Sequence, residues 1–259
     1  MKIVLIGAGN LATNLGKALL AAGHDILQIY SRTMESASSL ATVVGGSPTT
    51  DLKNINSNAD LYIISVKDSV LCDIIPVLCK GRERKTFIHT AGSMSIDVFQ
   101  GMALHYGVLY PLQTFSKFRE VNFTEIPCFI EGNDEFTINA LMGLCNSISD
   151  HVSLLSSEDR KYLHLSAVFA CNFVNHCYSI AADILDKHHI PFDVLLPLID
   201  ETARKVHEHN PHETQTGPAV RYDENVIRSQ SMLLRNNPIV KDIYERLSLN
   251  IHRNTLKND

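Results

Sequence analysis

The sequence lacks several features that define other classes of protein. Its 6 cysteines form no C-x-x-C pair and no tight cluster, so we expect small core thiols in a reducing compartment. There is no block of like charge, and 23 Lys+Arg against 28 Asp+Glu disfavour nucleic-acid binding through a basic face. Asn10, Asn14 and Lys17 interrupt the apolar run that follows Lys2. We therefore expect no export signal and no membrane span, and a cytoplasmic protein.

There is also no internal repeat and no low-complexity segment, and 45% hydrophobic residues are enough for a substantial core. Up to about residue 155, short β-branched runs alternate with helical stretches, which is typical of a parallel sheet. The expected strands are Lys2 to Ile6, Asp25 to Tyr30, Leu61 to Val66, Lys85 to Thr90, Val108 to Tyr110, Cys128 to Glu131 and His151 to Leu155. The expected helices between them are Asn10 to Ala22, Thr33 to Val43, Ser69 to Cys79 and Asp134 to Ser149, with turns at 45–48 and 80–82.

From residue 156 onward the alternation disappears and apolar residues follow helical spacing. The sequence therefore predicts an α/β, Rossmann-like, mostly parallel sheet domain over 1–155 and an all-helical domain over 156–259. Ser156 and Asp159 resemble a capping box at the first helix. Because 161–187 is apolar on nearly every face, we expect it to be buried against its own domain and a partner chain, in a homodimer. The later helices are expected at 192–209, 220–235 and 239–255.

A glycine-rich turn, Gly7-Ala8-Gly9-Asn10-Leu11-Ala12, stands between the first expected strand and the first expected helix. In a G-x-G-x-x-A turn the first glycine allows the tight bend, and the second lets the backbone approach a pyrophosphate. The N–H groups at the start of the helix, from Asn10 and Leu11 onward, then face the phosphates. The pattern predicts a dinucleotide site, since the required strand and helix flank it.

The end of the second expected strand indicates which dinucleotide binds. NAD-binding folds carry an acidic residue there for the ribose 2′-hydroxyl, but this chain has Tyr30-Ser31-Arg32-Thr33. A guanidinium on Arg32 and hydroxyls on Ser31 and Thr33 suit a 2′-phosphate, so NADP is the expected cofactor. The absent carboxylate also disfavours S-adenosylmethionine. An exposed arginine in an ordinary loop is the alternative.

Ligands of open parallel sheets lie at the carboxyl ends of the strands. The segments found there are 65–68, 89–93 and 110–116. Their candidate cofactor residues are Ser65, Val66, Lys67 and Thr90, and their candidate substrate residues are Ser93, Gln113 and Thr114. The ordinary alternative is helix capping, by Asp68 for a helix from Ser69 and by Ser93 or Ser95 for one from Ile96.

The glycine turn, the S-V-K-D strand end and the H-T-A-G-S segment together resemble the 6-phosphogluconate dehydrogenase-like superfamily, and Val66-Lys67 resembles pyrroline-5-carboxylate reductases. Three further segments resemble a family of two-domain NADP oxidoreductases with a Rossmann-like domain and an uncharacterised helical C-terminal domain. These are Pro111 to Phe115, Lys161 to Asn172 and Gly217 to Asp223. The resemblance covers essentially the whole chain and implies redox chemistry without a settled substrate. Members generally have histidine where this chain has Tyr110, so no acid/base role is carried over to that position.

The superfamily resemblance implies that the C-terminal helical domain closes the active site. The first long helix of that domain often supplies a lysine as acid or base and an asparagine that orients substrate. Here that helix offers Lys161, His164 and Asn172, and spacings of three and eight residues predict one shared face. Either Lys161 or His164 could donate the proton that a carbonyl or imine needs when it accepts hydride. A solvated lysine and a hydrogen-bonded core histidine are the alternatives.

Two more segments carry residue types that occur in binding sites. Arg221, in the loop Gly217 to Asp223, has a planar fork suited to a substrate carboxylate or phosphate, or it pairs with Asp223 or Glu224. The cluster His207, His209 and His212 has no acid or thiol partner, so we expect no metal. The sequence thus predicts an NADP-dependent oxidoreductase acting on a small polar carbonyl, imine or hydroxy acid. The alternatives are an NADP(H)-binding regulator without turnover and a deazaflavin-linked reductase.

Overall fold

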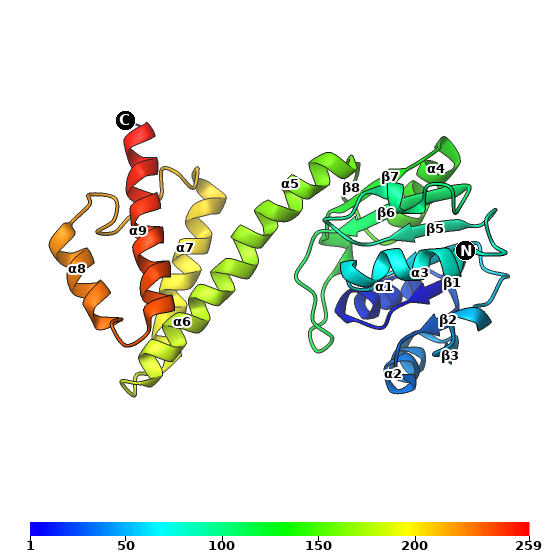
Figure 1. Cartoon of the computed structure of the whole chain (residues 1–259), viewed down its shortest axis with the longest axis horizontal. Coiled ribbons are helices and arrows are strands. Elements are labelled where there is room, and N and C mark those ends of the chain that lie inside the picture. Colours follow the sequence, from blue (N-terminus) through cyan, green and yellow to red (C-terminus); the bar gives the residue numbers. More distant parts are fainter. Residues whose placement is uncertain (259) are drawn as a thin grey trace. The chain divides into compact units, whose positions relative to one another are not determined.

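The computed structural model describes residues 1–258 and divides the chain into two compact units, Met1–Asn172 and the part from Phe173 onward. The strands and the helices that pack on them lie in the first unit, and the second unit is helical (Figure 1). The last strand ends at Leu154 and helix α5 begins at Ser157. All-helical structure therefore begins next to the predicted boundary at 156, while α5 itself groups with the first unit.

The first unit is built on an eight-stranded sheet in the order β3-β2-β1-β4-β5-β6-β7-β8. The strands are β1 (Lys2–Ile6), β2 (Asp25–Tyr30), β3 (Ser47–Thr49), β4 (Leu61–Ile64), β5 (Thr86–His89), β6 (His105–Pro111), β7 (Cys128–Gly132) and β8 (Val152–Leu154). Every neighbouring pair is parallel except β6 with β7. The predicted fold class, a mostly parallel Rossmann-like sheet followed by helices, is confirmed.

Alternating side chains of the strands form two cores, one on each face of the sheet. Ile3 and Leu5 belong to one core, whereas Val4 and Ile6 belong to the other. Helices α1 (Asn10–Ala21), α2 (Met34–Val44) and α4 (Glu135–Asn146) supply the first core, and α3 (Asp68–Cys79) supplies the second. Short 3₁₀ turns η1 (Leu52–Asn54), η2 (Ile96–Phe99) and η3 (Phe123–Glu125) connect these elements. Strands β1, β4 and β5 are thus covered on both sides, which holds their carboxyl ends in place.

Two predicted boundaries differ from the structure, and in both places glycine or proline lies in or beside a strand. The predicted turn at 45–48 is only partly correct, because Gly45 and Gly46 make the bend with positive φ and β3 then begins at Ser47. Pro48 is tolerated because β3 is an edge strand paired on one side only. Strand β6 is longer than the expected Val108 to Tyr110 because Gly107 lets Glu131 of β7 approach closely.

The buried cysteines are Cys79, Cys128 and Cys145, and burial raises the pKa of each thiol. The other three, Cys72, Cys171 and Cys177, are exposed, so the expectation of core thiols holds for half of them.

The chain then continues as helices from α5 onward. The elements are α5 (Ser157–Ala167), the π-helical segment η4 (Val168–Phe173), α6 (Val174–Asp186), η5 (Phe192–Leu195), α7 (Leu196–Glu208), α8 (Glu224–Leu233) and α9 (Pro238–Asn258). The Ser156 side chain accepts from Asp159 N at 3.1 Å, as the capping pattern predicts. Helix α8 starts later than expected because Tyr222 has a positive φ and Asp223 caps the helix. No helix within residues 1–258 is long and apolar enough to cross a bilayer.

The helical unit has almost no core within a single chain. From Phe173 onward, the described residues that are buried are only Ala219, Ser231 and Ser248. Helix α6, which the sequence predicts to be buried, has no buried residue. Its apolar side chains therefore lack the burial that stabilises a helix in a single domain.

Candidate active site

Backbone hydrogen bonds tie together the carboxyl ends of the central strands. Gly7 N donates to Tyr30 O at 2.8 Å, Ser65 N to Ile6 O at 2.7 Å and Thr90 N to Ile64 O at 3.1 Å. These bonds extend the parallel ladder by one residue beyond β1, β4 and β5. The loops that follow these strands consequently start side by side. They lie where the strand order reverses, because β2 and β4 pair with opposite edges of β1. That is the topological switch point, where ligands of such sheets bind.

The glycine turn has the geometry that its sequence predicts. Gly7 has φ +115°, and a Cβ there would overlap the Ser65 carbonyl oxygen, so only glycine fits. Gly9 precedes α1 and makes no side-chain cap, and a Cβ on it would meet nothing within 4 Å. The backbone N–H groups of the first turn of α1 are thus left open toward a ligand, and they carry the positive end of the helix dipole.

A cleft with a volume of about 630 Å³ opens over this edge of the sheet. Every predicted cofactor residue except Thr33 lines it: Gly7, Gly9, Asn10, Leu11, Ser31, Arg32, Ser65, Val66, Lys67 and Thr90. His164, one of the two candidate proton donors, lines the same cleft. The structure therefore brings together the strand-end residues that the sequence selected one by one.

Two predicted details of the cleft differ in the structure. Thr33 is the cap of α2: its hydroxyl accepts from Ser36 N at 3.3 Å and donates to Ser36 Oγ at 2.9 Å, so it is engaged by the helix. Asp68 does not cap α3, because it is the first residue of that helix, and its carboxylate accepts from the Ser93 hydroxyl. Asp68 lines the cleft, whereas Ser93 does not.

One part of the cleft holds a pair of rings. Tyr110, near the end of β6, and His164, on α5, are joined by a hydrogen bond of 2.9 Å between Tyr110 Oη and His164 Nδ1. The pair packs directly on Gly92, where a Cβ would lie 2.6 Å from His164 Nδ1. Sequence reasoning did not assign Tyr110 or Gly92 to the site. Gly92 lies in the H-T-A-G-S segment, but only the fold shows that His164 packs on it.

A buried charge network holds α5 against the sheet. Arg160, which is 1% exposed, donates to Glu131 Oε2 of β7 at 2.6 Å and to Met94 O at 2.6 Å. Ser157 at the start of α5 also donates to Glu131, from its hydroxyl at 2.7 Å and its backbone N–H at 3.0 Å. Since His164 is four residues after Arg160, it lies one turn further along the same face. The network thus sets the position of His164 in the cleft.

A fully buried histidine shapes the loop at the end of β5. His89 Nδ1 accepts from Ala91 N at 3.1 Å, and His89 Nε2 lies 3.3 Å from the Ser95 carbonyl oxygen. This pattern requires a neutral ring with its hydrogen on Nε2. Burial, the largest cause, lowers the pKa of His89 to about 4. His89 thereby orients Thr90, Ala91 and Gly92, which line the cleft.

Protonation of His89 is expected to make the protein less stable in weak acid. The folded pKa of about 4 lies below the usual 6.5, so the unfolded chain takes up the proton first. Neutral His89 makes its full contribution to the free energy of unfolding above pH 6.5, and this contribution is lost as the pH falls toward 4. At 1.36 kcal/mol per unit of pKa difference, the loss is about 3 kcal/mol. Urea unfolding at a series of pH values checks this. His89→Gln keeps an N–H for Ser95 but does not titrate, so the difference between the two proteins isolates His89 from His24, whose pKa is also lowered. If the unfolding free energies of wild type and His89→Gln changed in parallel between pH 6.5 and pH 4, His89 would not be the cause of the loss.

Several predicted site residues do not line this cleft. Lys161 lines a separate hollow with Ser95 and Asp97, because the α5 face that meets the sheet carries Arg160 and His164. Asn172 is exposed and lies in the π-helical segment η4. Gln113 and Thr114 are exposed after β6 and bond to each other. Arg221 is exposed in the loop before α8. Their predicted roles stay predictions.

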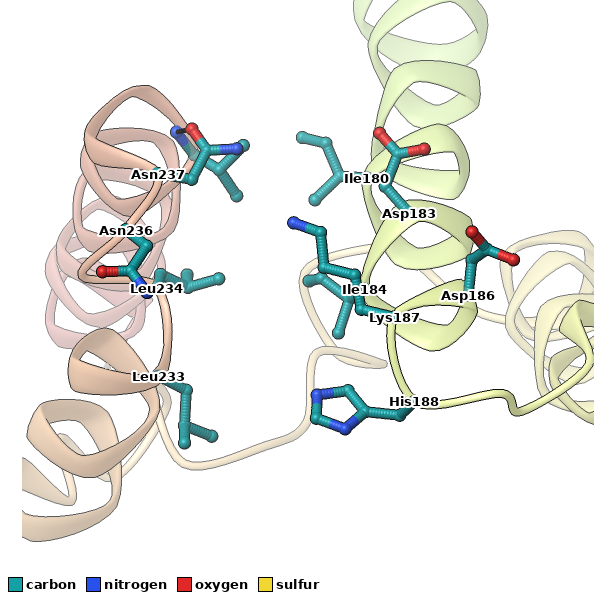
Figure 2. Close-up of a pocket in the computed structure, with 11 residues that line it drawn as sticks. Ile180, Asp183, Ile184, Asp186, Lys187, His188, Leu233, Leu234, Asn236 and Asn237 are labelled. Carbon is teal, nitrogen blue, oxygen red and sulfur yellow. Dashed lines mark hydrogen bonds between the residues drawn. The ribbon is translucent and has the colours of Figure 1, made fainter.

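The helical unit contains a second hollow, also about 630 Å³ in volume. Figure 2 shows Ile180, Ile184 and Lys187 of the α6 region on one side and Leu233 and Leu234 at the end of α8 facing them across the gap. The wall is mixed, with apolar side chains beside Asp183, His188 and Asn237. It has none of the strand-end loops or glycine turns that form the first cleft.

Comparison with known proteins identifies the family. Residues 2–92 match a model described as "NADP oxidoreductase coenzyme F420-dependent", and residues 126–251 match a "Domain of unknown function (DUF2520)". No curated protein matches the sequence.

Among solved structures, a "putative NADP oxidoreductase" from Bacteroides fragilis is 53% identical, with a TM-score of 0.94, over 97% of this chain and 98% of its own. An imine reductase from Myxococcus stipitatus in complex with NADP⁺ is 14% identical, with a TM-score of 0.68, over 100% of this chain and 95% of its own. A 1-pyrroline-5-carboxylate reductase from Streptococcus pyogenes is 15% identical, with a TM-score of 0.62, over 98% of each chain. The last two share the fold alone. The chain belongs to the NADP oxidoreductase family whose members join a Rossmann-like domain to this helical C-terminal domain.

Proposed function

We propose that the protein is an NADP-dependent reductase that exchanges hydride between the nicotinamide and a small polar carbonyl, imine or hydroxy-acid compound. The observation that carries this proposal is one cleft lined by a glycine turn, an arginine at the end of β2 and the ring of His164. The imine reductase relative with NADP⁺ and the pyrroline-5-carboxylate reductase relative have the same fold and support the reaction class.

The residues present fit a bound NADP. Gly9 leaves free space at the start of α1, where the open N–H groups can hold a pyrophosphate. Among the described residues, the side chains of Arg32 and Lys67 make no hydrogen bond or ion pair, so both cations are free for phosphate groups. Residues 31–33, directly after β2, include no carboxylate to hold an unphosphorylated ribose. When bound, the reduced nicotinamide would supply the hydride.

Replacement of Arg32 tests the cofactor assignment. We expect Arg32→Ala to weaken NADPH binding about 10-fold to 100-fold, because a hydrogen bond to a charged group contributes about 1.5–3 kcal/mol, while NADH binding stays unchanged. Titration calorimetry with both nucleotides measures this, and Arg84→Ala, at an exposed site outside the cleft, is the matched control. Equal affinity of the wild type for NADH and NADPH, or an unchanged Arg32→Ala variant, would overturn the NADP assignment.

Two other functions use the same cofactor cleft and remain distinguishable. A regulator that senses NADP(H) would bind the nucleotide but oxidise no NADPH with any carbonyl, imine or 2-oxo acid. A deazaflavin-linked reductase, which the family model's description favours, would transfer hydride between NADP(H) and coenzyme F420. Following the absorbance of NADPH against a substrate panel, and that of F420 in a separate reaction, separates the three.

We also propose that the protein works as a homodimer joined through the helical unit. The supporting observation is that, within the described residues from 173 onward, no large apolar side chain is buried. A unit of this size cannot offset its conformational entropy without an apolar core. A second copy of the chain is present wherever the chain itself is, and two-fold dimers are the commonest form of homo-oligomer. The apolar side chains around the hollow in Figure 2, including Ile180, Ile184 and Leu233, are assigned to this interface.

A further inference from the structure

The hydrogen bond between Tyr110 and His164 determines how the imidazole can act. Tyr110 is 8% exposed, and burial, the largest cause, raises the pKa of its phenol above the usual value. The hydroxyl therefore keeps its proton at neutral pH and can donate it to His164 Nδ1, 2.9 Å away. A neutral imidazole that accepts at Nδ1 carries its hydrogen on Nε2.

The environment of His164 leaves this Nε2–H available. The Nδ1 edge of the ring packs on Gly92 and Tyr110, as the 2.6 Å separation of Nδ1 from an ideal Gly92 Cβ position shows. Nε2 lies on the opposite side of the ring, and no group in the described part of the chain forms a hydrogen bond with it. The ring also lines the cleft. The rest of the ring is held in place, so this unpartnered N–H is suited to donate its hydrogen to a substrate atom.

We propose that Tyr110 and His164 form the proton-donating pair of the reaction, with His164 Nε2–H as the catalytic donor and Tyr110 as the positioning residue that sets its tautomer. This inference rests on the proposed function and deepens it, because it assigns the proton donor. It favours substrates whose reduced atom is the carbon of a C=O or C=N group, since their oxygen or nitrogen can accept from an N–H.

The proton transfers balance with the pair as the only acid. With hydride that a bound reduced nicotinamide would supply, the substrate carbon gains one C–H bond and the π electrons of its C=O or C=N bond move to the heteroatom. His164 gives its Nε2 proton to that heteroatom as Nδ1 takes the hydroxyl proton of Tyr110, and the Tyr110 oxygen takes one proton from water in the same step. The imidazole thus stays neutral with its hydrogen on Nδ1, and Tyr110 stays a neutral phenol. Proton exchange with water then returns the ring to the Nε2–H form that the Tyr110 hydrogen bond favours.

The tautomer can be measured on the protein without any cofactor. In ¹⁵N-histidine-labelled protein, with the His164 signals assigned by His164→Gln, we expect one protonated Nε2 and an unprotonated, hydrogen-bonded Nδ1 at pH 8. Tyr110→Phe keeps the aromatic ring and removes only the hydroxyl, so a mixture of both tautomers is expected. Tyr106→Phe, on the same strand but outside the cleft, should leave the signals unchanged. An Nδ1–H tautomer in the wild type, or no change in Tyr110→Phe, would overturn the pair.

Kinetics separate this inference from the proposed function. With a turned-over substrate, we expect His164→Gln to lower kcat about 100-fold or more and Tyr110→Phe about 10-fold, with unchanged NADPH affinity in both. If wild-type protein binds no NADPH or reduces nothing, the proposed function fails, whatever the tautomer. If wild-type protein turns over and both variants keep its kcat, the proton-donating pair alone is wrong.

Discussion

Arg160→Met is expected to lower the free energy of unfolding of the N-terminal unit by about 3 kcal/mol, at the lower end of the range for breaking a buried ion pair. The change leaves the Glu131 carboxylate without its cation and the Met94 carbonyl without its donor. Glu131 keeps two hydrogen bonds from Ser157, which limits the loss. Hydrogen exchange of the sheet amides measures this unit separately from the helical one.

Two further variants test the physical cause. Arg160→Met combined with Glu131→Leu removes both charges, so much of the lost stability should return. Arg204→Met breaks an exposed pair with Glu201 and should change the unfolding free energy by less than about 1 kcal/mol. If Arg160→Met alone costs no more than Arg204→Met, the network does not anchor α5. Because Arg160 sets the position of His164, reduced proton donation should accompany the loss of stability.

Leu233→Asp is expected to dissociate the proposed homodimer. Leu233 is 81% exposed within one chain, so the substitution leaves the chain's own packing intact. In a two-fold interface it removes two buried leucines, roughly 4 kcal/mol in total, which corresponds to about a thousandfold weaker association. Sedimentation equilibrium over a range of concentrations measures the dissociation constant. Wild-type protein should have twice the chain mass of 28.8 kDa and the variant should approach that single mass at micromolar concentration.

The matched control is Leu104→Asp, an exposed leucine in the loop before β6 of the N-terminal unit. It introduces the same charge and should keep the wild-type dissociation constant. A wild-type mass near that of one chain at all concentrations would contradict the homodimer. Equal weakening by both variants would show that the aspartate charge, and not the apolar face of the helical unit, causes the effect.

The most successful sequence inferences rest on local backbone requirements. Gly7 must be glycine because of its positive φ and the adjacent Ser65 carbonyl, and the strand before it and helix after it are local consequences of side-chain pattern. The strand-end rule then selected Arg32, Lys67 and Thr90 without knowledge of strand order, because every parallel strand ends at the same edge. Thr33 was expected at the cofactor and caps α2 in the structure, because a hydroxyl before a helix can either cap it or bind a ligand and the sequence does not distinguish these uses.

The helix bearing His164 shows the limit of spacing arguments. Residues 161, 164 and 172 share a face by simple periodicity, but which face meets the sheet depends on the buried Arg160, whose partner Glu131 is 29 residues away. Lys161 consequently lines a different hollow, and a π-helical segment changes the register before Asn172. Tyr110 became a candidate only when β6 placed its hydroxyl against His164.

The sequence by itself determined the Rossmann-like class, the glycine turn and the cation in place of an acid after β2, because each depends on residues close together in the chain. The tertiary structure decided which side chains meet at the cleft: Tyr110 with His164, Glu131 with Arg160, and Gly92 beneath the rings. These contacts join residues from different strands, loops and helices. Their pairing follows from strand order and helix orientation, which are set by packing of the whole unit and not by any local pattern.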